Sequence, residues 1–192
     1  MKIIKENFYT VIKLWLNQFA AMFLSALLLL PAASLDGDWP LLAVSIFTTL
    51  FYLVLIFWVS CELGLKDNVP IEMGRMKRKW YKGTVLSLTA NSLSILASIV
   101  ACISKLFIPG VSFLGSTDGI AGTAANVYFF PAIINEILHP MYRGMILYFG
   151  LGGRIPFIYL PVALLSIVVC TLGYLAGSKG MFASLLAKNS RE

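Results

Sequence analysis

Three ionisable side chains, Glu136, His139 and Arg143, stand three and four positions apart in one stretch of the chain. Residues at this spacing lie on one face of a helix, so the three would share a face if a helix passes through Pro140. Ionisable groups inside a membrane often move protons or substrates. The cluster could do such work, or it could form an ordinary ion pair on the water-exposed side of a helix at the membrane surface.

A second set of polar residues repeats at steps of four and three, which places it on one stripe of a helix. Serine and asparagine on such a stripe can bond across packed membrane helices, or they can line a polar path. The amide of Asn91 has the most hydrogen-bonding positions to satisfy away from water. The polar residues of the stripe are Ser87, Asn91, Ser94, Ser98 and Lys105, with Ala101 at the step between the last two.

Metal and cofactor chemistry is not indicated by the sequence. Glu136 and His139 supply only two ligands, and the chain has no second histidine. The three cysteines, Cys61, Cys102 and Cys170, lie in apolar runs without a CxxC pair, and we interpret them as small buried side chains. P-loop, HExxH and GxSxG motifs are absent. We therefore predict no metal, no cofactor and no enzymatic activity.

The composition is that of an integral membrane protein. Of 192 residues, 59% are hydrophobic and 12% are charged, whereas soluble domains carry about 25% charged residues. The formal charge of +6 would also suit a nucleic-acid-binding protein. The basic residues cluster beside apolar runs, however, where they set orientation and contact anionic lipid. We expect a lipid bilayer, and no nucleic acid, as the partner.

Four apolar runs are long enough to cross a membrane, because about 20 helical residues span a core of about 30 Å. They predict spans at about residues 14–35, 40–62, 83–105 and 155–178. An Asp-Gly-Asp turn at residues 36–38 joins the first two spans into a hairpin. The first run follows lysines, as in a signal peptide, but it is longer than the usual apolar region of one. We predict an uncleaved span.

Two other segments are predicted to lie at the membrane surface or partly within it. Residues 2–13 have the apolar spacing of an interfacial helix. Within the loop region 107–153, residues 126–149 carry two prolines and two charges, which argues against a simple span and favours a re-entrant or interfacial segment over a fifth span. We predict an all-α single membrane domain over residues 1–192, with four transmembrane helices in two hairpins and these two additional segments.

The orientation follows from a basic loop at residues 65–82. With this loop and both termini on one side, all but Lys105, Arg143 and Arg154 of the 15 basic residues lie there. Because cytoplasmic loops carry the excess of Lys and Arg, both termini are predicted to be cytoplasmic, in a multi-pass protein of the cell membrane. Some loop residues could also contact anionic lipid: Arg75, Lys77, Arg78, Lys79 and Lys82.

Three functional hypotheses follow. The leading one is a non-enzymatic subunit or accessory factor that acts through helix contacts with a second copy or a partner protein. Gly173 and Gly177, a small-xxx-small pair, would allow such close packing. The second is a transporter or channel-like protein that uses the polar stripe and residues 126–149. The third is a membrane-embedded lipid-modifying enzyme with Glu136 and His139 as acid and base.

Overall fold

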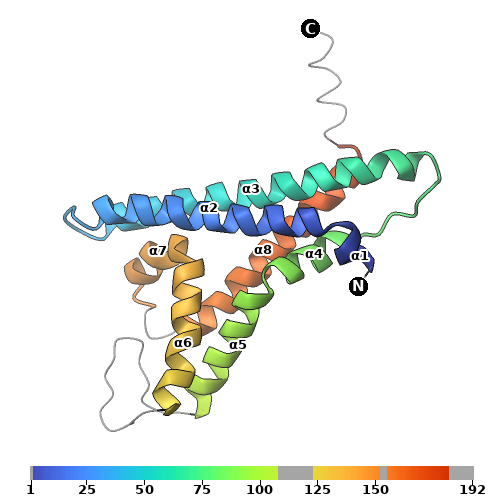
Figure 1. The fold of residues 1–192 in the computed structure, drawn as a ribbon. Coiled ribbons are helices and arrows are strands. Elements are labelled where there is room, and N and C mark those ends of the chain that lie inside the picture. Colours follow the sequence, from blue (N-terminus) through green and yellow to red (C-terminus); the bar gives the residue numbers. More distant parts are fainter. Residues whose placement is uncertain (1, 108–122, 152–154, 182–192) are drawn as a thin grey trace. The chain divides into compact units, whose positions relative to one another are not determined.

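Helices form all the regular structure in the computed structural model, which describes residues 2–107, 123–151 and 155–181 (Figure 1). This agrees with the predicted all-α class. The elements are α1 (Lys2–Glu6), α2 (Phe8–Ala32), α3 (Trp39–Glu72), α4 (Lys82–Ala90), α5 (Ser92–Phe107), α6 (Thr123–Leu138), the 3₁₀ turn η1 (Pro140–Tyr142), α7 (Arg143–Tyr148) and α8 (Ile155–Ser178).

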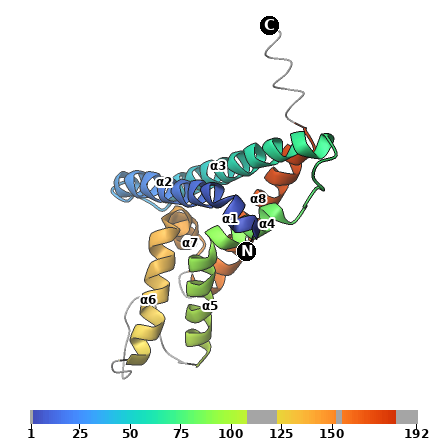
Figure 2. The same ribbon diagram turned by 45° about the vertical axis from the view of Figure 1, so that its right-hand side comes forward.

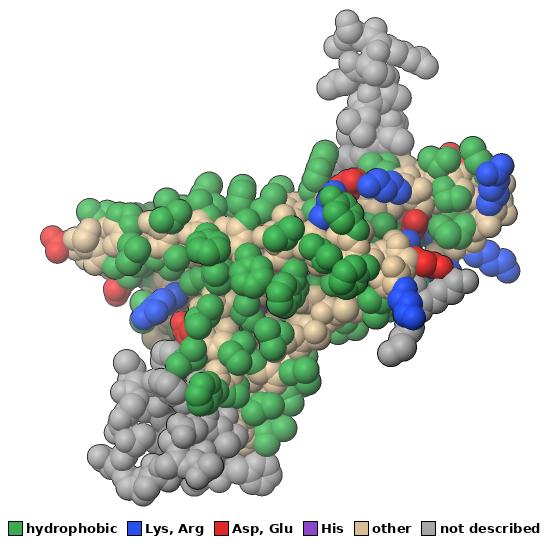
Figure 3. Space-filling model, in the orientation of Figure 1, with side chains coloured by type: hydrophobic (Ala, Val, Ile, Leu, Met, Phe, Trp, Pro, Cys, Tyr) green, Lys and Arg blue, Asp and Glu red, His purple; other side chains and the backbone are tan. Residues whose placement is uncertain are grey.

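Several of these helices could cross a membrane. In the described part of the chain, α2, α3 and α8 are long and apolar enough, and α4 and α5 pass the same test only as a bent pair, which is either one broken span or a re-entrant loop. The structure therefore has three to four candidate spans, which supports a multi-pass membrane protein in contact with lipid. Many hydrophobic side chains cover the visible face of the molecule (Figure 3). The pairing of the spans into two hairpins stays a prediction.

The N-terminal surface helix is shorter than predicted. A helix over residues 2–13 was expected, but α1 ends at Glu6 and α2 already begins at Phe8. Asn7 separates them, and its side-chain amide donates to the carbonyl of Ile3 at 2.8 Å. Such a bond from a side chain to the backbone competes with continuation of the helix.

The second long helix extends into the predicted basic loop. We expected the loop to begin at residue 65, but α3 continues through Pro70 to Glu72. The signal that ends α3 is Gly74, whose φ is +69°. Glycine adopts this conformation easily, and the N–H of Arg75 then donates to the carbonyl of Pro70 at 2.9 Å, which closes the helix end.

The predicted third span is interrupted at Asn91. This residue has φ −91° and ψ 6°, and it lies between α4 and α5. Its side-chain amide donates to the carbonyl of Ser87 at 3.0 Å, which stabilises the end of α4. The prediction of one continuous helical stripe is therefore wrong: Ser87 lies on α4 and Ser94 on α5. The side chain of Lys105 lies outside the described residues.

The chain divides into two compact units, which we describe separately. Unit 1 comprises Met1–Asn17, Tyr52–Asn91 and Leu164–Glu192, and unit 2 comprises Gln18–Phe51 and Ser92–Ala163. The organisation as a single membrane domain stays a prediction.

Glycines bring α3 and α8 together within unit 1. A Cβ atom added at Gly173 would lie 2.5 Å from the carbonyl oxygen of Phe57 on α3. One added at Gly177 would also meet a backbone carbonyl of α3, and one added at Gly64 would meet the backbone of α8. Backbone atoms cannot move aside as the end of a side chain can. The small-xxx-small pair therefore lies in a contact within the chain, which we call the glycine seam.

In unit 2, α5 and α6 pack side by side (Figure 2). The short helix α7 is held against the first part of α3. The N–H of Gly144 donates to the hydroxyl of Ser45 at 2.8 Å, and a Cβ added at Gly144 would meet the carbonyl of Leu41. These contacts position the end of α6 and the turn η1, which carry the polar residues described next.

Candidate functional site

Ser94 on α5 joins two polar residues from the end of α6. Its Oγ lies 3.0 Å from Asn135 Oδ1 and 2.7 Å from His139 Nε2. Asn135 and His139 are four positions apart, so both side chains reach the same serine. All three residues are at most 1% exposed. The structure thus brings one residue of the predicted polar stripe against one residue of the predicted ionisable cluster.

The hydrogen bonds define the protonation of this site. Ser94 donates its single hydroxyl hydrogen to Asn135 Oδ1, so it accepts a hydrogen bond from His139 Nε2. Burial lowers the pKa of His139 to about 4, and its imidazole is therefore neutral at pH 7. A neutral imidazole carries one N–H, so its Nδ1 is a bare acceptor.

Several atoms around this serine are buried without a hydrogen-bond partner among the described residues. They are Asn135 Nδ2, His139 Nδ1, the Tyr142 hydroxyl and the Ser98 hydroxyl. Ser98 follows Ser94 by one turn on α5, and the centre of the Tyr142 ring lies 6.0 Å from that of His139. An unmade buried hydrogen bond costs about 1–3 kcal/mol. We call Ser94, Ser98, Asn135, His139 and Tyr142 the Ser94 cluster.

A tyrosine of α8 completes the surroundings of the imidazole. The ring of Tyr159 stacks on that of His139, with centroids 5.8 Å apart and an interplanar angle of 24°. The Tyr159 hydroxyl donates to Glu136 Oε1 at 2.9 Å. Tyr159 thus contacts both the imidazole of His139 and the carboxylate of Glu136.

The predicted ionisable cluster does not form one helical face. The expectation required a helix through Pro140, but α6 ends at Leu138 and Pro140 opens η1. Proline lacks an N–H and its ring disfavours a helical conformation in the preceding residue, which accounts for the break. The three side chains consequently differ in environment: His139 is buried, Glu136 is half-buried and Arg143 is exposed.

A second buried polar group lies in unit 1. The ammonium of Lys82 lies 2.7 and 3.0 Å from the two carboxylate oxygens of Asp67, and the Tyr174 hydroxyl donates to the same carboxylate at 2.9 Å. The side chains of Lys82 and Asp67 are only 9% and 13% exposed. Lys82, which we had predicted to contact anionic lipid, is instead buried in an ion pair.

The other residues of the predicted lipid contact differ in exposure. Arg78 donates to the carbonyl of Ser178 at 3.0 Å and so ties the basic loop to the end of α8. Arg75 and Lys77 are exposed, and Lys79 is half-buried. Lipid contact by these four side chains stays a prediction.

Sequence reasoning missed several residues of both sites. Asn135 carried the same signal as Asn91, an amide within an apolar run, and it could have been found on that ground. Nothing in the sequence marks Tyr159 and Tyr174 as site residues, because tyrosines are common in apolar runs and the polar partners of these two lie far away in the sequence. Asp67 was hidden because we expected it to lie in a solvated loop.

These features define a helical, multi-pass membrane protein with a buried polar cluster whose hydrogen bonds are only partly made. Comparison of the chain with protein-family models, curated proteins and solved structures finds no match. Within the described residues, no group of three or more His, Cys, Asp or Glu side chains could hold a metal ion. The functional argument therefore depends on the Ser94 cluster itself.

Proposed function

We propose that the chain is a non-enzymatic membrane protein that binds a small, uncharged polar solute at the Ser94 cluster, as a carrier or a solute-binding subunit does. The unpaired buried atoms of the cluster are the observation that carries this proposal. His139 Nδ1 accepts, Asn135 Nδ2 donates, and the hydroxyls of Ser98 and Tyr142 can do either. A solute with both donors and acceptors would complete these bonds without bringing a charge into a neutral site.

Two breaks in the helices support a binding role over simple packing. Ser94 lies in the first turn of α5, just after the interruption at Asn91, and His139 follows the last residue of α6. Broken helices expose backbone donors and acceptors at membrane depth, and they are tolerated where they line a cavity or are buried in protein. Transporters commonly place their substrate at such breaks.

The hydrogen-bond pattern favours binding over nucleophilic catalysis. Ser94 and His139 are close enough for a nucleophile and its base. A base must accept the hydroxyl hydrogen, however, and here that hydrogen goes to Asn135 while His139 Nε2 carries its own. Glu136, the acid of the enzyme hypothesis, bonds to Tyr159. Both observations support the non-enzymatic proposal.

The hypothesis of a subunit that contacts a second copy or a partner protein is kept, but without the glycine pair of α8 as the contact surface. Gly173 and Gly177 pack against α3 of the same chain, so a second copy or partner protein would have to use other surfaces.

We keep the proposed orientation, with both termini and the basic loop in the cytoplasm. A cysteine introduced at the exposed Lys77 should then react with impermeant reagents from that side alone.

Replacement of Asn135 by leucine tests the solute site. We expect purified protein to be stabilised against heat by at least one member of a panel of neutral amides, polyols and sugars. Because Asn135→Leu removes a hydrogen-bond donor to the solute, the Kd of this variant for the stabilising solute should be about tenfold higher. Native mass spectrometry should show the matching loss of bound solute.

Ser104→Ala is the matched control, because the Ser104 hydroxyl donates to Val100 of its own helix at 2.8 Å and lies outside the cluster. Its affinity should equal that of the unchanged protein. If no solute stabilises the protein and Asn135→Leu raises its stability, the cluster is a packing feature and the proposal is wrong.

A further inference from the structure

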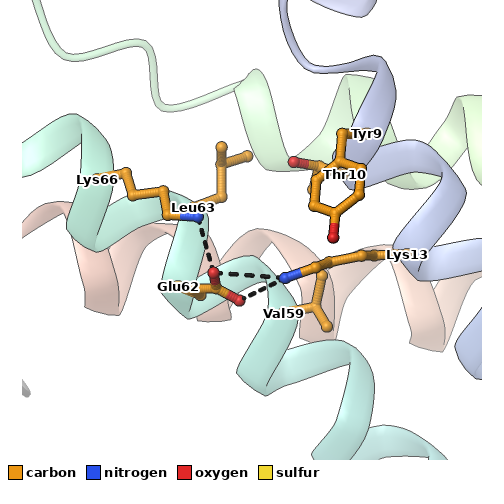
Figure 4. A pocket seen from close by; sticks show the side chains of 7 residues that line it. All are labelled: Tyr9, Thr10, Lys13, Val59, Glu62, Leu63 and Lys66. Carbon is orange, nitrogen blue, oxygen red and sulfur yellow. Dashed lines mark hydrogen bonds and ion pairs between the residues drawn. The ribbon is translucent and has the colours of Figure 1, made fainter.

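A pocket opens in unit 1 between the beginning of α2 and the second half of α3 (Figure 4). It is a shallow pocket with a cavity volume of about 20 Å³, partly open to its surroundings. This pocket is separate from the Ser94 cluster and plays no part in the proposed solute binding. The residues that line it are Tyr9, Thr10, Lys13, Val59, Glu62, Leu63 and Lys66.

The pocket has an excess of positive charge. Lys13 Nζ lies 3.1 and 3.4 Å from the two carboxylate oxygens of Glu62, and Lys66 Nζ lies 2.8 Å from one of them. Two ammonium groups therefore share one carboxylate, which leaves a net charge of +1. The Lys13 and Lys66 side chains are 32% and 66% exposed, and each ammonium has three donors. Each of the two ammonium groups therefore keeps N–H donors that can bind a second anion.

The sequence places these charges at the level of the lipid head groups. Lys13 directly precedes the uncharged run 14–35, and Glu62 directly follows the uncharged run 41–61. Each run is long enough to cross the hydrocarbon core, so the charges at its end lie in the head-group layer. Tyr9 is 68% exposed beside them, and tyrosine is enriched in this layer.

We propose that this pocket binds the phosphate of an anionic phospholipid. Lys13 and Lys66 donate to the phosphate oxygens in charge-assisted hydrogen bonds, and the first carbons of the lipid lie against Val59 and Leu63. Unlike the exposed lysines and arginines of the basic loop, these two are held together by a shared carboxylate. The pocket is therefore expected to retain individual lipid molecules.

Native mass spectrometry of the full chain, titrated with phosphatidylglycerol or phosphatidylcholine, tests this proposal. A basic residue near an anionic surface contributes about fivefold in affinity. Lys66→Gln should therefore weaken phosphatidylglycerol binding about fivefold, and Lys13→Gln/Lys66→Gln should weaken it about 30-fold. Phosphatidylcholine binding should change little.

Arg75→Gln/Lys77→Gln is the control, because it removes two exposed charges outside the pocket. It should leave the number of tightly held phosphatidylglycerol molecules unchanged. An equal loss in both double variants would overturn the proposal in favour of general surface attraction. Competition by glycerol phosphate at the same concentration as the lipid would also overturn it, because the site would then bind free phosphate.

Discussion

Replacement of Asp67 by alanine is expected to lower the free energy of unfolding by roughly 3–5 kcal/mol. The carboxylate of Asp67 receives both the Lys82 ammonium and the Tyr174 hydroxyl in the interior of unit 1. Without it, Lys82 would keep a buried charge with no partner. Such a charge is far more costly than the loss of an exposed ion pair.

The double replacement Asp67→Leu/Lys82→Met distinguishes the cost of an unpaired buried charge from the cost of altered side-chain packing. Because it removes both charges, it should recover most of the lost stability, as replacing a buried pair by apolar groups often does. Lys66→Met, at an exposed ion pair with Glu62, should change the free energy of unfolding little. Unfolding in mixed micelles at rising SDS fraction measures all three. Equal losses in the single and double variants would contradict the ion-pair account.

Gly177→Ala is expected to cost about 1–3 kcal/mol or more, although it adds a single methyl group. That methyl would meet the carbonyl of Cys61 and lie 2.9 Å from the backbone nitrogen of Leu65. Both neighbours are backbone, so α3 and α8 must separate, and the close contacts along the glycine seam weaken. The expected effect is therefore on the fold itself, before any effect on association with other chains.

Val168→Leu is the matched control for the seam, because it adds one carbon to an exposed position of the same helix. It should change the thermal unfolding midpoint little, whereas Gly177→Ala should lower it clearly. If Gly177→Ala instead keeps the midpoint and changes only the oligomeric state, the glycine faces another chain and the seam is described wrongly.

The candidate spans were largely predictable because apolar run length is a local property. The predicted last span, residues 155–178, coincides with α8. Where the helix boundaries in the structure differ from the predicted ones, a single residue ends the helix through its backbone or side chain. The loop is predicted from residue 65, whereas α3 continues to Glu72 and Gly74 closes it. Asn91 is predicted to lie within a continuous helix, whereas its side chain bonds to Ser87 at the end of α4.

The candidate sites were less predictable, because they depend on contacts between distant segments. Ser94 and His139 were each named from local spacing, yet nothing in that spacing shows that they touch across 45 positions. Lys82 has the same signal as its basic neighbours, and only the fold places Asp67 beside it. Periodicity shows which face of a helix a residue occupies, but the partner of that face comes from packing.

The central claim is that a polar solute reaches the Ser94 cluster, and cysteine labelling tests it most directly. A cysteine replaces Ser98 in a background in which the three buried native cysteines are alanine. Leu96→Cys, on the exposed apolar face of α5, is the control for lipid-facing positions. A charged, membrane-impermeant thiosulfonate reagent is then applied to sealed vesicles, because it reacts with thiols in contact with water.

If the cluster opens to admit a solute, Ser98→Cys should be labelled over minutes while Leu96→Cys is not, and a bound solute should slow the reaction. If Ser98→Cys stays unlabelled from either side while a cysteine at Lys77 reacts at once, water does not reach the cluster. The Ser94 cluster would then be a structural network, and the account of its function would be wrong.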